Sequence, residues 1–88
     1  MLTQKSFKKE ISKQTHHAIN LYDSELVHTE EVQQGNKMLT SYYYLYFNYE
    51  YNCIIYYKEI TEGVIDSSGD VNDVQSLGYE ILKCYKFM

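Results

Sequence analysis

The sequence predicts a small two-layer α+β domain with the element order α-β-β-β-α, in which a three-stranded antiparallel meander carries two helices on one face. Three observations predict this fold: a helical apolar pattern near the N-terminus, three runs rich in β-branched and aromatic residues, and a second helical pattern toward the C-terminus. Because 88 residues suffice for one modest core and are too few for two, residues 1–88 are expected to form a single domain.

The first element is an amphipathic helix predicted over residues 3–22. Apolar positions Phe7, Ile11, Ala18 and Tyr22 follow one another at spacings of four or seven residues, which keeps them on one helix face. Four lysines lie largely off that stripe: Lys5, Lys8, Lys9 and Lys13. The helix is therefore expected to pack its apolar face on a sheet and to expose a basic face.

Three strands are predicted over residues 25–33, 38–47 and 53–60. Gly35 lies between the first two strands and can adopt the positive φ that a type II′ hairpin turn needs at its first central position. Polar residues 48–52 predict a second turn, so the strands are expected to form an antiparallel meander. If residues 25–33 are a loop instead, the sheet shrinks to a hairpin that needs a second chain for stability.

The second helix is predicted from Val71 to the C-terminus. Val71, Val74, Leu77 and Ile81 lie three or four residues apart, as on one face of a helix. Asp70 stands where an N-cap is expected, because its carboxylate can accept a hydrogen bond from the first free backbone N–H groups. This helix is expected to lie on the same sheet face as the first.

The charge of the chain is divided unequally along the sequence. The net charge is −4, with about +3 on residues 1–22 and −7 on residues 23–88. All eight cations are lysines, so the planar fork with which arginine grips phosphate is absent. The acidic body is expected to repel nucleic acid and to attract basic protein surfaces, and direct nucleic-acid binding is disfavoured.

A run of tyrosines is the most informative feature of the sequence, because seven of residues 41–51 are aromatic. Side chains alternate between the two faces of a strand, so one face must present tyrosine to something other than the core. The more apolar set, Leu45 and Phe47, is expected to point inward. A partner-binding surface is then predicted from the outward tyrosines and nearby acids: Tyr42, Tyr44, Tyr46, Glu30, Glu31 and Glu50. A homodimer that covers the tyrosine row is the alternative.

Nothing in the sequence predicts a catalytic, metal or cofactor site. Cys53 and Cys84 are expected to be free thiols in a reducing cytosol, since their spacing fits neither a disulfide framework nor a zinc motif. His28 near Glu30 could form an acid-base pair, yet solvated strand positions are the preferred explanation of both residues. No enzyme activity and no cofactor are expected. The absence of a long apolar run predicts a cytoplasmic protein with no membrane contact.

A short, acidic, single-domain chain without catalytic residues resembles, in type only, the small inhibitors encoded by phages and mobile elements, including anti-CRISPR proteins. That resemblance implies a non-enzymatic protein-binding module that occupies a functional, nucleic-acid-binding surface of a larger partner, such as a nucleic-acid-processing complex. The alternative function is a nucleic-acid-associated protein that places the lysines of its first helix on phosphates and stacks tyrosines on bases. Its lysine contacts would be Lys5, Lys8, Lys9 and Lys13.

Overall fold

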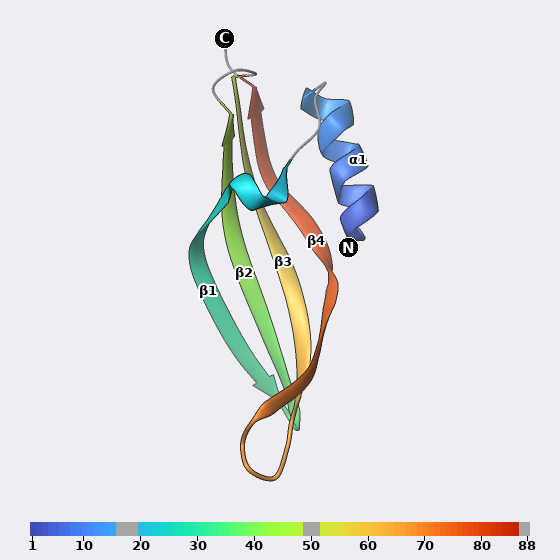
Figure 1. Cartoon of the computed structure of the whole chain (residues 1–88), viewed down its shortest axis with the longest axis vertical. Helices are drawn as coiled ribbons and strands as arrows, with labels where there is room; N and C mark the ends of the chain where they lie inside the picture. The colour runs from blue at the N-terminus through green and yellow to red at the C-terminus, as the bar shows by residue number, and fades with distance from the viewer. Residues whose placement is uncertain (16–19, 49–51, 87–88) are drawn as a thin grey trace.

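The computed structural model contains one α-helix and one four-stranded antiparallel sheet (Figure 1). The helix α1 (Gln4–Thr15) is followed by a short 3-10 helix, η1 (Leu21–Asp23). Four strands follow and lie in the sheet in sequence order: β1 (Ser24–Gln34), β2 (Lys37–Asn48), β3 (Cys53–Ile65) and β4 (Val71–Lys86). The structure describes residues 1–15, 20–48 and 52–86, and within them no helix is long and apolar enough to cross a membrane.

The N-terminal helix is confirmed where the structure describes it, and it is shorter than predicted. Phe7, Ile11 and Thr15 form the buried stripe of α1, at the spacing of four that the sequence pattern gives. Residues 16–19 lie outside the described residues, and the predicted end at Tyr22 falls in η1 instead. Asn20 caps η1, because its side-chain oxygen accepts a hydrogen bond of 3.1 Å from the Tyr22 N–H.

The three predicted strands are present as β1, β2 and β3. Gly35 carries a φ of +63°, as the predicted turn between β1 and β2 requires. β3 runs five residues further than predicted, to Ile65, because β4 supplies a partner along that extension. The turn between β2 and β3 lies partly outside the described residues, and Asn52 at its end has a φ of +51°.

The predicted second helix is wrong, because β4 pairs with β3 from one end to the other. Three irregularities in this pairing interrupt the register, so positions on one face of β4 recur after two or three residues instead of strictly after two. Tyr79, Ile81 and Cys84 are three such successive positions. In a strand interrupted in this way, apolar and polar residues no longer alternate strictly. The apolar residues then recur at the spacings typical of a helix.

The residues expected to cap that helix instead organise the loop before β4. The Asp66 carboxylate accepts hydrogen bonds from the N–H groups of Ser68 and Asp70, at 2.9 and 3.0 Å, and from the Asn72 amide at 2.7 Å. The bond from Asp70, followed by that from Asn72, lowers the pKa of Asp66. Asp70 is therefore a donor to a turn rather than an N-cap.

The predicted α-β-β-β-α fold class is consequently wrong. Only one helix is present in the described residues, so two helices cannot cover the sheet, and the sheet has four strands instead of three. α1 lies alongside β4 (Figure 1) and contributes Phe7 to the core. The Phe7 ring centroid lies 4.8 Å from that of Tyr57 and 5.1 Å from that of Tyr79. This aromatic cluster fixes the helix on one face of the sheet.

The prediction of which side chains in the tyrosine-rich strand point into the core is also wrong. Tyr46 is only 2% exposed and belongs to the core, and Tyr44 packs against the core with its ring 5.3 Å from that of Tyr57. Tyr43, Leu45 and the other odd-numbered positions of β2 lie on the opposite face. Polarity alone predicts the reverse, but aromatic rings stack on the Phe7 cluster while their hydroxyls reach polar partners.

We predict that Gly78→Ala destabilises the fold by more than about 1 kcal/mol. Gly78 has a φ of +139°, and an added Cβ would lie 2.7 Å from the Leu2 carbonyl oxygen. That oxygen accepts the Tyr79 N–H at 2.7 Å, so the bond that ties the N-terminus to β4 would be disturbed. Urea unfolding at fixed protein concentration measures the loss. Ser76→Ala, at an exposed position of β4, is the control, and equal stability of the two variants would contradict the prediction.

Candidate functional site

The sheet face opposite α1 is covered by no described element. We call it the open face and define it by six aromatic and aliphatic side chains from three strands: Leu39, Tyr43, Leu45, Ile54, Tyr56 and Tyr85. Every buried side chain among the described residues belongs to α1 or to the other sheet face. An apolar face of this kind marks a contact surface.

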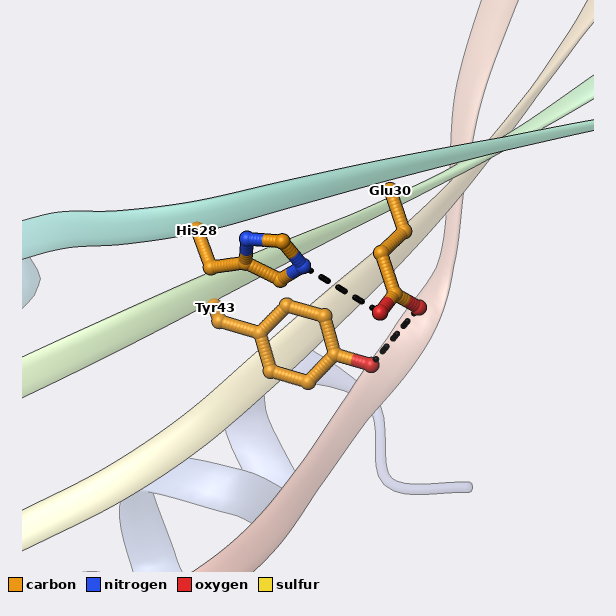
Figure 2. A network of polar contacts seen from close by, with 3 residues as sticks. All are labelled: His28, Glu30 and Tyr43. Carbon is orange, nitrogen blue, oxygen red and sulfur yellow. Dashed lines mark hydrogen bonds and ion pairs between the residues drawn. The ribbon is translucent and has the colours of Figure 1, made fainter.

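Tyr43 lies near the middle of the open face and joins a small polar network. Figure 2 shows its hydroxyl donating a hydrogen bond of 3.3 Å to one oxygen of Glu30, whose other oxygen lies 3.2 Å from His28 Nε2. The Tyr43 ring also stacks with Tyr56, at a centroid distance of 6.1 Å. His28 and Glu30 are each 56% exposed, so water screens their attraction and the pair holds Tyr43 in place only weakly.

The charges on the open face are nearly balanced and largely paired with one another. Its paired positions carry three lysines against four glutamates: Lys37, Lys58, Lys83, Glu25, Glu30, Glu62 and Glu80. Lys58 lies 3.4 Å from Glu80 and 5.8 Å from the centroid of the Tyr43 ring. Lys37 lies 3.2 Å from Glu62. The face therefore combines apolar area with little net charge.

The outer edge of β1 is acidic, in contrast to the open face. Strand β1 pairs only with β2, so its other edge presents unpaired backbone groups. All its side chains from Glu25 onward are exposed. Residues 23–34 contain four carboxylates and no lysine. Glu31 points to the side of the sheet opposite the open face, and Glu30 points to the open face.

The structure separates the residues that the sequence grouped into one surface. Tyr46 is buried and Tyr44 is partly buried under the helix side, while Tyr42 lies on that same side opposite Glu59. Glu30 and Glu31 are exposed on β1, facing opposite sides of the sheet. Glu50 lies outside the described residues. A partner contact by the exposed glutamates stays a prediction, whereas the three tyrosines share the helix side of β2 and do not form an exposed row.

The open face is formed by other aromatic residues than those predicted. Tyr56 and Tyr85 come from β3 and β4, and Tyr43 shares a face of β2 with Leu45, which the sequence predicts to point inward. A usable signal was present, because the hairpin register that places Tyr44 opposite Tyr57 also places Leu45 opposite Tyr56. Tyr85 could not be placed while β4 was read as a helix.

The four lysines of α1 are exposed on the helix and do not approach the open face, which lies across the sheet. Lys8 alone of the four lines a cleft of about 500 Å³ between the helix side and the sheet, together with Tyr44 and Tyr57. The Tyr57 hydroxyl donates a hydrogen bond of 2.6 Å to Ser24 Oγ. Tyr57 belongs to the core and Tyr44 packs against it, but Tyr22, which also lines this cleft, is 97% exposed. One exposed tyrosine therefore shares the cleft with Lys8.

Cys53 and Cys84 lie on neighbouring strands, on the same side of the sheet and at diagonal positions, and no disulfide joins them. Burial raises the pKa of the Cys84 thiol, which disfavours the reactive thiolate. Among the described residues, no group of three or more His, Cys, Asp or Glu side chains is arranged to hold a metal ion. Two of the three histidines, His16 and His17, lie outside those residues.

We predict that the stability of the protein falls as the pH rises from about 10 toward about 12, and that Tyr79→Phe reduces this fall. Burial, followed by a hydrogen bond with Glu59, raises the pKa of Tyr79 to about 12. The folded state therefore keeps a proton that the unfolded chain loses near pH 10, and deprotonation then favours unfolding. Burial also raises the pKa of Tyr44 and Tyr57, so part of the fall remains in the variant.

Urea unfolding at about pH 9 and about pH 11.5 measures this difference, with the shift of the midpoint as the readout. Tyr22→Phe is the matched control, because this side chain is 97% exposed, and it is expected to keep the wild-type pH dependence. An identical fall in the wild type and in Tyr79→Phe would contradict the assignment.

Comparisons with protein-family models, with curated proteins and with solved structures find no match to this chain. Its function is therefore argued from its two contrasting surfaces, the charge-balanced open face and the acidic β1 edge.

Proposed function

We propose that this chain is a non-enzymatic protein-binding module, a small acidic inhibitor that occupies a basic surface of a larger protein. The observation that carries the proposal is the β1 edge, where exposed carboxylates stand without a lysine beside an unpaired strand edge. A basic segment of another protein would find both opposite charge and free backbone groups there. Such a surface suits a partner that normally binds nucleic acid, because phosphate-binding surfaces are basic.

The positions of the carboxylates outside the open face also support binding of a basic partner at the β1 edge. Seven described carboxylates lie outside the paired positions of the open face: Glu10, Asp23, Glu31, Glu59, Asp66, Asp70 and Asp73. The Ile65 N–H donates a hydrogen bond of 2.7 Å to the Asn36 carbonyl, so the loop that contains Asp66 and Asp70 lies next to the end of β1. Acidic residues therefore continue from the β1 edge to the end of the sheet, and this field would steer a basic partner toward that side.

The size and charge of the chain resemble those of phage-encoded antagonists, and they support a role in which binding itself blocks the partner. The free thiol of Cys84 supports a cytoplasmic partner. Nucleic-acid binding by the lysines of α1 is the second candidate, because all four are exposed on one short helix. The protein-binding function is favoured over nucleic-acid binding because residues 23–88, which follow α1, carry an excess of carboxylates.

We predict that Glu31→Lys lowers partner capture by about fivefold to tenfold, because it places a like charge against a basic surface. Immobilised protein is incubated with nuclease-treated bacterial lysate, and the retained proteins are quantified by mass spectrometry. Glu10→Lys is the matched control, since it makes the same change of charge on α1 and is expected to keep wild-type capture. Capture should also weaken as salt is raised.

The same assay tests the nucleic-acid alternative through the double variant Lys5→Gln/Lys9→Gln. Under the proposed function, this variant retains the same protein as the wild type, with or without nuclease. If retention disappears with nuclease and in the lysine variant, while Glu31→Lys has no effect, the chain binds nucleic acid through α1 and the proposed function is wrong.

A further inference from the structure

The one described α-helix lies on the other face of the sheet, so no described element covers the open face. The molecule is also elongated. The radius of gyration is 15.0 Å, whereas a compact domain of this length has about 12 Å. The accessible surface is 6020 Å², compared with about 5,400 Å² for a typical monomer of the same mass. The molecule as a whole, which is 52 Å long, thus exposes about 600 Å² more than a typical monomer, and this excess is of the order of the roughly 800 Å² that each partner buries in a stable dimer.

The chemistry of the open face restricts what can cover it. Its lysines are already engaged: Lys58 with Glu80 and Tyr43, and Lys83 with the Tyr85 ring at 4.7 Å from the centroid. A strongly basic or acidic partner would therefore find little unpaired charge to recognise on this face. A second copy would find apolar area with little like-charge repulsion, because the three lysines and four glutamates of the face nearly cancel.

The apolar side chains are also placed where a symmetric contact needs them. Tyr43 and Tyr56 lie on the two central strands and stack with each other, so they would occupy the middle of an interface, where binding energy concentrates. Leu45 and Ile54 lie on the same two strands. Polar side chains of β1, including His28 and Glu25, lie toward one margin of the face and would form a polar rim.

We propose that two copies of this chain pack open face against open face, as an isologous dimer with Tyr43 and Tyr56 at its centre. Two twisted sheets that pack in this way lie about 10 Å apart and interdigitate their inner side chains. Glu25 and Glu30 lie at the margin of this contact, whereas Glu31 and the unpaired backbone edge of β1 stay outside it, so each copy still presents an acidic edge. The proposal goes beyond the proposed function, because it concerns a different surface and needs no other protein.

The experiment is sedimentation velocity on the purified full-length chain from about 1 to about 100 µM. The wild type is expected at about twice 10.5 kDa at the upper concentration. Tyr56→Glu is expected to be monomeric, because it buries a carboxylate at the centre of the contact; Lys83 opposite Tyr56 can pair with it in the free monomer. Val74→Glu is the matched control and should stay dimeric, because this 59% exposed valine is outside the open face.

A wild type that stays monomeric over this range overturns the proposal and leaves the open face to a different protein. A dimer that survives Tyr56→Glu overturns it as well, because the contact then lies elsewhere. Circular dichroism checks that Tyr56→Glu remains folded. If the variant unfolds, isotope-filtered NOEs on a mixture of labelled and unlabelled wild type decide the question. Contacts between copies at Tyr43, Leu45 and Tyr56 are expected, and their absence from a dimeric sample contradicts the proposal.

Because these measurements use purified protein alone, their failure leaves the capture assay on the β1 edge unaffected. Conversely, Glu31 lies on the opposite side of the sheet from the open face, so loss of capture in Glu31→Lys does not depend on the dimer. The two proposals can therefore fail separately.

Discussion

The structure depends on one constraint: a single helix of twelve residues can cover only part of one face of a four-stranded sheet. The Phe7 ring decides which face, because it stacks on Tyr57 and Tyr79 and draws the even-numbered tyrosines of β2 toward the core. The odd-numbered positions are left on the other side. Both the location of the core and the existence of the open face follow from that contact.

The charged residues are also divided between two surfaces, the open face on one hand and the β1 edge with the loop before β4 on the other. On the open face, lysines and glutamates pair with one another or with tyrosine rings, while the β1 edge and the loop before β4 carry carboxylates almost alone. Apolar, charge-balanced faces suit permanent self-association, and charged, wet surfaces suit partners that arrive and leave. Under the two proposals, one small sheet would hold two copies of itself together and still offer acidic edges to a basic protein.

The sequence allowed the first hairpin and the first helix to be predicted, because each depends on local chemistry. Gly35 supplies the positive φ of the turn, and Phe7 and Ile11 define a helical stripe. β4 could not be predicted in the same way, because its irregular pairing with β3 breaks the alternation that identifies a strand. Which tyrosines are exposed was also beyond local reasoning. The exposure of each tyrosine depends on which face of the sheet the Phe7 ring packs against, and Phe7 is distant in the sequence.

For the site, the exposed glutamates of β1 were identifiable from their charge and their position beside a turn. The open face was not, since it joins side chains from three strands, including Tyr85 of the strand that was read as a helix. Residues that meet only through the pairing of β2, β3 and β4 share no motif. Their common property appears once the register is known.

The most direct test of this account is the set of NOEs made by the ring protons of Phe7 in solution. The account predicts strong NOEs to the rings of Tyr57 and Tyr79, whose centroids lie 4.8 and 5.1 Å away. NOEs from Phe7 to Tyr43 or Leu45 instead would place the helix on the other face of the sheet. That result would contradict the assignment of the core and of the open face together.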